Sequence, residues 1–218
     1  MEKENFAGHK KYGQSILHGL EQKLVTWGTP KVPKYLETYT LTCMTVLWSL
    51  GVLVFGWLSK ASIHWLWGTS FMIFCQYITD LFDGAVGRYR NTGLIKWGYY
   101  ADHFLDYIFM SCLLIGYSFF IPDRYNVLFY IMMIYGAFMV NAFVSFAARN
   151  QFQISYFGIG PTEVRIGFIA VNSMLIIVGK VYLAQFLPLL LIAAFISLCI
   201  VVYKNQKILW DMEMKGKK

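Results

Sequence analysis

Charged side chains are scarce in this sequence. Asp, Glu, Lys and Arg make up 14% of its 218 residues, whereas a typical soluble domain carries about 25%. Hydrophobic residues reach 57%, and the mean hydropathy is +0.49. This balance excludes an ordinary soluble domain and predicts a polytopic membrane protein, short enough to form one compact helical domain.

Three further absences narrow the class of protein. The cysteines lack the spacing of metal ligands, so we interpret Cys43, Cys75, Cys112 and Cys199 as apolar packing residues. The N-terminus is polar up to about Tyr39 and lacks the apolar core of a signal peptide, so we expect no cleaved leader. The net charge of +7 forms no basic stripe with interleaved aromatics, which excludes nucleic acid as a partner. The positive charge flanks apolar stretches instead, where it suits anionic lipid headgroups.

Long apolar stretches set the expected fold class. A helix needs about 20 apolar residues to cross the hydrocarbon core of a bilayer. Six stretches approach that length, and we expect an all-α, polytopic membrane bundle with six transmembrane helices. Their expected ranges are 41–58, 63–79, 99–121, 127–146, 164–179 and 181–203.

The polar N-terminal segment contains a helical repeat of apolar residues. Between Tyr12 and Trp27 they recur at the spacing of one helix face, which predicts an amphipathic helix lying in the membrane interface. We therefore expect three parts: a cytoplasmic segment 1–38 with this interfacial helix, a six-span domain 39–203 and a basic cytoplasmic tail 204–218.

The distribution of Lys and Arg predicts the orientation in the membrane. With six spans, sixteen of the nineteen basic residues fall on the side of both termini. Only Lys60, Arg124 and Lys180 fall on the other side. Because cytoplasmic loops are enriched in Lys and Arg, both termini are expected in the cytoplasm.

Most of the acidic residues in the apolar region gather in one stretch. Between Thr38 and Tyr203 there are six, and four of them are Asp80, Asp83, Asp102 and Asp106. Buried carboxylates are costly unless they are paired, bound to metal or facing water. The spacings of three and four residues place each pair on one helix face. Two such helices facing each other would present four hard oxygen ligands, which suit Mg²⁺, Mn²⁺ or Ca²⁺ and favour a diphosphate substrate.

Small residues and one arginine accompany the aspartates. Gly84, Gly87 and Gly98 would admit a ligand close to the backbone, and Arg88 has the forked geometry that binds phosphate. Alternatively, the glycines serve tight helix packing, and Arg88 is one of the positive charges expected on the cytoplasmic side.

The pattern resembles that of the CDP-alcohol phosphotransferases, also called CDP-alcohol phosphatidyltransferases. Their motif reads Asp-x-x-Asp-Gly-x-x-Ala-Arg, about eight residues, then Gly-x-x-x-Asp-x-x-x-Asp, and the chain departs from it only in having Gly87 for Ala. The Pro-Asn that usually precedes the first span in the family is not evident. The resemblance implies an integral membrane enzyme, active as a homodimer, that displaces CMP from a CDP-linked alcohol with a second alcohol.

The resemblance also implies residue roles. Asp80, Asp83 and Asp102 would hold Mg²⁺ or Mn²⁺, and Asp106 would act as general base, also touching metal. Gly84, Gly87, Arg88 and Gly98 would bind the CDP and phosphate groups.

Two features are similar to the choline/ethanolamine phosphotransferase branch: His103 directly after Asp102, and the sequence Thr162-Glu163-Val164. They favour a CDP-aminoalcohol donor with diacylglycerol as acceptor, with His103 near the chemistry. We also assign Glu163, Arg149 and Arg165 to a substrate pocket. Alternatively, His103 is a bystander, and Glu163 caps a helix.

Other functions fit less well. CDP-diacylglycerol with a small polar alcohol, such as inositol phosphate, glycerol phosphate or serine, is the main alternative substrate pair. A prenyltransferase would carry two well-separated aspartate clusters in a longer bundle, and a divalent-cation transporter would carry acids deep in several spans. The small size indicates a bacterial plasma membrane, or the ER membrane for a eukaryotic protein.

Overall fold

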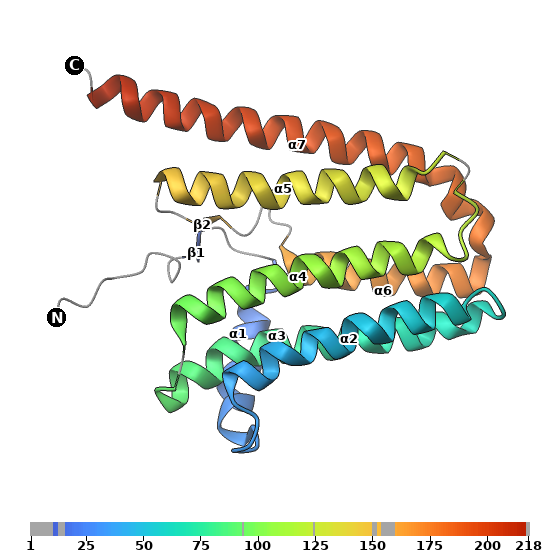
Figure 1. Cartoon of the computed structure of the whole chain (residues 1–218), viewed down its shortest axis with the longest axis horizontal. Coiled ribbons are helices and arrows are strands. Elements are labelled where there is room, and N and C mark those ends of the chain that lie inside the picture. The colour runs from blue at the N-terminus through green and yellow to red at the C-terminus, as the bar shows by residue number, and fades with distance from the viewer. Residues whose placement is uncertain are drawn as a thin grey trace.

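The computed structural model describes residues 11–12, 16–92, 94–123, 125–149, 152–153 and 160–216. Seven α-helices dominate this part of the chain (Figure 1). In order, the elements are β1 (Lys11–Tyr12), α1 (His18–Gly28), η2 (Thr29–Lys31), α2 (Thr38–Leu58), η3 (Ile63–Trp65), α3 (Leu66–Arg90), α4 (Ile95–Ser118), α5 (Val127–Arg149), β2 (Phe152–Gln153), α6 (Pro161–Val178) and α7 (Lys180–Gly216).

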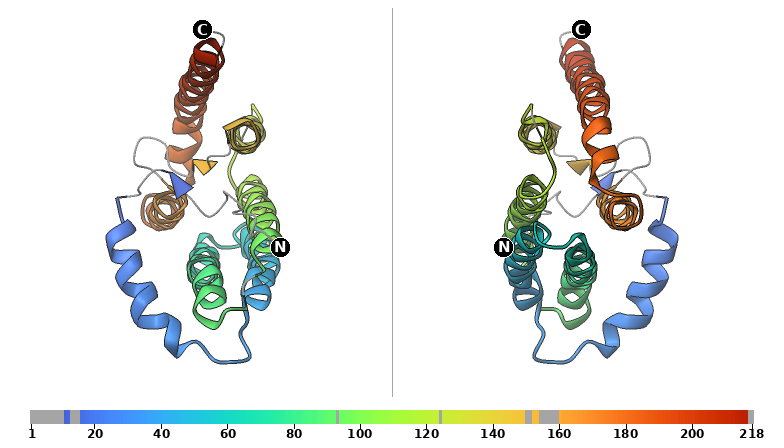
Figure 2. Two further views of the ribbon diagram at one scale, coloured as in Figure 1. Left: turned by 90° about the vertical axis from the view of Figure 1, so that its left-hand side faces the viewer. Right: turned by 90° about the vertical axis from the view of Figure 1, so that its right-hand side faces the viewer.

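The long helices form a bundle, and α1 crosses it. In the end-on views of Figure 2, α2 to α6 are seen down their axes, whereas α1 is seen lengthwise beside them. The helix α1 spans His18–Gly28, within the stretch from Tyr12 to Trp27 whose apolar spacing predicted a helix. Lys11 and Tyr12 instead form β1, which pairs in parallel with Phe152 and Gln153 of β2. In this pairing, backbone N–H and C=O groups of the two strands bond each other, and do not form the hydrogen bonds of a helix.

The membrane character of the chain follows from its helices. Among the described residues, four segments are long and apolar enough to cross a bilayer: Thr38–Leu58, Val127–Arg149, Pro161–Val178 and Gln185–Lys215. Large apolar side chains face outward on them, such as Leu47, Val144 and Ile177. Apolar surface of this extent is stable against lipid, so the chain is an integral membrane protein.

Two expected helices are longer than the apolar stretches that predicted them. The helix α3 continues past its apolar part to Arg90, and α7 continues through most of the basic tail to Gly216. The left-handed residue Asn91 ends α3, and its backbone N–H bonds the last carbonyls of that helix. As a result, Asp80 and Asp83 lie within a regular helix.

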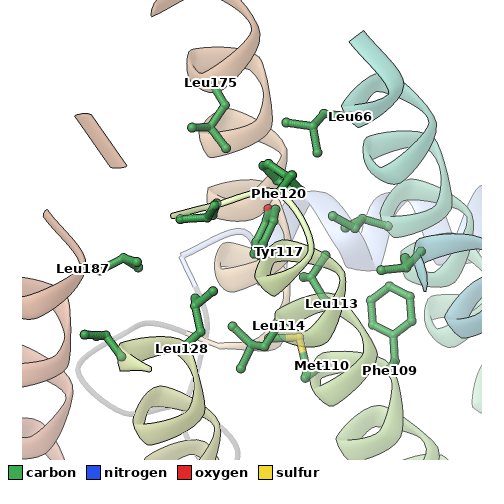
Figure 3. Close-up of a cluster of buried hydrophobic side chains, with 14 residues drawn as sticks. Leu66, Phe109, Met110, Leu113, Leu114, Tyr117, Phe120, Leu128, Leu175 and Leu187 are labelled. Carbon is green, nitrogen blue, oxygen red and sulfur yellow. The ribbon is translucent and has the colours of Figure 1, made fainter. Parts of the chain in front are cut away.

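The hydrophobic core is built along the second half of α4. Its side chains Phe109, Leu113 and Tyr117 are almost fully buried (Figure 3). They form one cluster with Leu66 of α3, Leu175 of α6, and residues of α2, α5 and α7. The four aspartates lie outside this core, toward the start of α4 and the end of α3.

Hydrogen bonds inside the bundle also fix how α3, α4 and α6 pack. The hydroxyl of Tyr117 donates to Oδ1 of Asn172 at 2.6 Å, and Nδ2 of Asn172 donates to Ser70 Oγ at 3.0 Å. All three side chains are buried. Polar bonds of this kind hold membrane helices together where the hydrophobic effect between helices is absent.

The helices α2 and α4 cross at a pair of glycines. A Cβ added at Gly56 would lie 2.6 Å from the Cα of Gly116. That distance is too short for any side chain, so α2 needs glycine at position 56 to approach α4. A Cβ at Gly116 would lie 3.3 Å from the carbonyl oxygen of Val52, which is a tight contact.

We expect Gly56→Ala to lower thermal stability. The added methyl would force α2 and α4 apart, at a cost of about 1–3 kcal/mol. Gly167→Ala is the matched control, because nothing lies within 4 Å of a Cβ there, and it should gain up to about 1 kcal/mol from helix propensity. The measurement is the melting temperature in detergent, and equal melting temperatures for the two variants would contradict the glycine contact.

Candidate active site

Two helices bring the acidic residues together. Asp80 and Asp83 lie on α3, and Asp102 and Asp106 on α4, so each pair occupies one helix face. One carboxylate oxygen from each of Asp80, Asp83 and Asp102 lies within 4.8 Å of the other two. Three carboxylate oxygens at this spacing fit a single hard cation such as Mg²⁺ or Mn²⁺.

A buried arginine from α6 joins the two pairs. Nη1 of Arg165 lies 2.8 Å from Oδ2 of Asp80, and its Nη2 lies 2.9 Å from Oδ1 of Asp106. Only 6% of the Arg165 side chain is exposed. The planar fork of a guanidinium can bond two carboxylates at once, which lysine cannot do with the same geometry. Arg165 therefore offsets part of the negative charge and connects α3, α4 and α6 at the site.

Asp106 lies beside the group of three carboxylates. Its Oδ1 accepts from Arg165 and also from Nε2 of Gln76, at 2.9 Å each. Gln76 is fully buried on α3, four residues before Asp80. Two donors on one oxygen orient the carboxylate, which suits a residue that must present itself to a substrate hydroxyl.

The start of α2 supports Asp83. The hydroxyl of Thr42 donates to Oδ2 of Asp83 at 2.9 Å, and the hydroxyl of Thr38 donates to its backbone carbonyl at 3.0 Å. Oδ1 accepts from the backbone N–H of Gly84. These bonds orient the carboxylate in the way that neighbouring groups usually orient metal ligands.

Gly84, Gly87 and Arg88 follow Asp83 on α3, and Gly98 lies on α4 four residues before Asp102. A Cβ at Gly84 would lie 3.3 Å from Nη1 of Arg88, whose exposed side chain folds back over this glycine. Gly87 is buried in α3, and nothing lies within 4 Å of a Cβ at Gly98. Their roles in binding CDP and phosphate stay predictions.

His103 lies next to the site but is packed among aromatic rings. Its Nδ1 is 3.2 Å from Oδ2 of Asp102. The ring stacks edge-on against Tyr99 at 4.6 Å between centroids, and Phe143 lies 6.0 Å away. A role in orienting Asp102 fits this position, and the predicted catalytic role stays a prediction.

The structure separates the three residues assigned to a substrate pocket. Arg165 contacts the aspartates directly. Glu163 accepts from the backbone N–H groups of Gly160, at 2.8 Å, and Leu17, at 3.2 Å. Glu163 therefore caps the N-terminus of α6, which was the alternative considered from the sequence, and its pocket role stays a prediction.

Arg149 ties two helices together at the end of α5. Its Nη2 donates to Oγ of Ser145 and to Oδ1 of Asn205 on α7. In the part of the chain that the structure describes, its hydrogen bonds go to Ser145 and Asn205 and not to the aspartates. A place in the substrate pocket for Arg149 therefore stays a prediction.

Several supporting residues were missed in the sequence. Gln76 and Thr42 are polar side chains inside apolar stretches, and that signal could have singled them out. Glu21, whose carboxylate accepts from the hydroxyls of Tyr77 and Thr162, could not have been found in this way, because it lies on the polar N-terminal segment, far along the chain from the motif.

Long apolar helices and a cluster of three carboxylates define an integral membrane protein with a candidate site for a divalent cation. A family model, CDP-alcohol phosphatidyltransferase, matches residues 39–206. The chain therefore belongs to the CDP-alcohol phosphatidyltransferase family, as the motif had indicated, and its branch within the family is not resolved. No curated protein and no solved structure matches the chain significantly. Membership favours phosphodiester formation from a CDP-linked alcohol over prenyl transfer or ion transport.

We expect Asp83→Asn to weaken Mn²⁺ binding by about tenfold or more, because it removes a charged ligand from the group of three. The measurement is Mn²⁺ titration of the purified protein, followed by electron paramagnetic resonance. Asp123→Asn is the control, since the Asp123 carboxylate caps α5 beyond the far end of α4. It should lower thermal stability and leave Mn²⁺ affinity unchanged. Equal Mn²⁺ affinity in both variants would remove Asp83 from the site.

Proposed function

We propose that this protein is a metal-dependent phospholipid-synthesis enzyme. It transfers the phosphoalcohol group of a CDP-linked donor to a second alcohol and releases CMP. The observation that supports this best is the group of Asp80, Asp83 and Asp102 with Asp106 held beside it. The family match over most of the chain supports the same reaction class.

In this proposal the four aspartates have two different roles. Asp80, Asp83 and Asp102 would hold Mg²⁺ or Mn²⁺, which when bound would neutralise charge on the diphosphate and on the leaving CMP. Asp106 accepts the proton of the acceptor hydroxyl while the oxygen of that hydroxyl attacks the phosphorus that bears the donor alcohol. A new P–O bond forms, the bond from that phosphorus to the bridging oxygen breaks, and CMP leaves.

Arg165 and Gln76 orient the base. Both donate to the same oxygen of Asp106, so the carboxylate is fixed by α3 and α6 together. Arg165 also bonds Asp80, which aligns the base with the group that holds the metal. Arg88, which is exposed on α3, would bind a phosphate of the donor through its guanidinium fork.

The preferred substrate pair is a CDP-aminoalcohol with diacylglycerol, based on His103 and the Thr162-Glu163-Val164 sequence. The alternative is CDP-diacylglycerol with a small polar alcohol. The homodimer that the family resemblance implies also stays a prediction, and the mass of the protein in lipid nanodiscs measures it.

We expect purified protein with Mg²⁺ or Mn²⁺ to release CMP from one donor of a panel: CDP-choline, CDP-ethanolamine and CDP-diacylglycerol, each with matching acceptors. Asp106→Asn should lower turnover by about 10²-fold or more, because it removes the base, and largely spare donor binding. Asp123→Asn is again the control. Absence of metal-dependent CMP release from every donor, even with native lipid extract, would overturn the enzyme assignment. Normal turnover of Asp106→Asn would overturn the base.

We further propose six spans, α2 to α7, with α1 in the cytoplasmic interface. The helices α3 and α4 contain the four aspartates, which lower their hydropathy below that of the other four. Support comes from the bias of Lys and Arg toward one side, and from α1 lying across the bundle with Leu20 and Trp27 exposed (Figure 2).

This topology predicts that the connection before α3 and the connection after it are accessible from opposite sides of the membrane. In a variant without the native cysteines, Ser62→Cys should react with a membrane-impermeant maleimide in intact cells. Lys96→Cys, at the start of α4, should react only after the membrane is opened. Labelling of both positions from one side would exclude six spans with a cytoplasmic site.

A further inference from the structure

One acidic residue outside the family motif contacts the two helices that carry Asp80 and Arg165. Glu21 lies on α1, and its Oε1 accepts from the hydroxyl of Tyr77 on α3 at 3.4 Å and from the hydroxyl of Thr162 on α6. Tyr77 and Glu21 are half-buried, and Thr162 is buried. One carboxylate therefore links three helices.

Both partners of Glu21 lie one helical turn before a residue of the site. Tyr77 precedes Asp80 by three residues on α3, and Thr162 precedes Arg165 by three on α6. Residues three apart share a helix face. Arg165 in turn bonds Asp80 and Asp106. Glu21 thus connects α3 and α6 a second time, one turn away from the point where Arg165 bonds Asp80.

The helix α1 has two further anchors at this site. At its start, the N–H of Leu17 donates to Oε1 of Glu163 at 3.2 Å. At its end, a Cβ on Gly28 would lie 2.6 Å from the ring of Phe82, the residue between Leu81 and Asp83 in the motif. The helix α1 is therefore anchored to α6 near its start and to α3 at its end, in addition to the contacts of Glu21.

We propose that Glu21 is a positioning residue: through Tyr77 and Thr162 it aligns Asp80 with Arg165, and so makes the geometry of the site depend on the docking of α1. Its acceptor oxygen sets the spacing between α3 and α6 at the level of the carboxylates. This inference rests on the proposed function for its catalytic consequence, and on the aspartate cluster alone for its effect on metal binding.

The test compares Glu21→Leu, which removes the acceptor at similar volume, with Glu21→Gln, which keeps a carbonyl oxygen for both hydroxyls. Mn²⁺ affinity and turnover should fall by about 10- to 100-fold in Glu21→Leu, the usual effect of losing a group that orients metal ligands, and Glu21→Gln should recover most of that loss. Gln22→Leu makes the same polar-to-apolar change on the exposed side of α1 and should leave both quantities unchanged.

Two milder variants test the same bonds in case Glu21→Leu does not fold. Tyr77→Phe and Thr162→Val each remove one donor to Glu21 while keeping the ring or the branched side chain. Each should weaken Mn²⁺ binding by itself, and in combination with Glu21→Leu the effects should be less than additive, because both substitutions remove the same bond. Wild-type Mn²⁺ affinity in Glu21→Leu, Tyr77→Phe and Thr162→Val would overturn the proposal.

The same measurements separate this inference from the proposed function. If the wild-type protein releases no CMP from any donor, the proposed function fails, and the Mn²⁺ titrations still decide the role of Glu21. If CMP is released and Glu21→Leu changes neither Mn²⁺ affinity nor turnover, the positioning role alone fails.

Discussion

The ion pairs of Arg165 with Asp80 and Asp106 are the interaction on which the site depends. Carboxylates from neighbouring helices repel one another, and each is costly to withdraw from water. A buried guanidinium placed between them, at 2.8 and 2.9 Å, lets α3 and α4 bring their acids to one place. It also requires α6 to pack against α3, and the buried bonds of Asn172 to Tyr117 and Ser70 hold the three helices in that arrangement.

The negative charge of the aspartates that Arg165 does not offset, together with the location of the site, suits metal-assisted chemistry on a diphosphate. Asp80, Asp83 and Asp102 stay close enough to share one cation, while Asp106 is oriented beside them by two donors. The group lies in the half of the bundle toward the end formed by Arg90 of α3 and Ile95 of α4, next to the start of the hydrophobic core along α4. In the proposed topology that end meets the cytoplasmic interface, where a water-soluble partner and a lipid partner can both reach it.

Much of the site could be predicted from the sequence, because the motif is contiguous and acids are rare in the apolar region. The four aspartates, their pairing on two helices and the family followed from spacing alone. Other residues were harder to interpret. Glu163 reads equally well as a pocket residue or a helix cap, and only its bonds to Gly160 and Leu17 show the cap. Arg165 was assigned to the pocket, yet nothing in its spacing predicted the bridge between Asp80 and Asp106.

The sequence by itself determined the membrane class, the helical fold, the family and the carboxylates, because each rests on composition or on residues close together along the chain. The tertiary structure alone decided which distant groups complete the site. Arg165 lies 59 residues from Asp106, and Glu21 lies 141 residues from Thr162. No local periodicity relates such positions. Their contacts arise from the way α1 and α6 pack on α3, which depends on shape and on buried hydrogen bonds across the whole bundle.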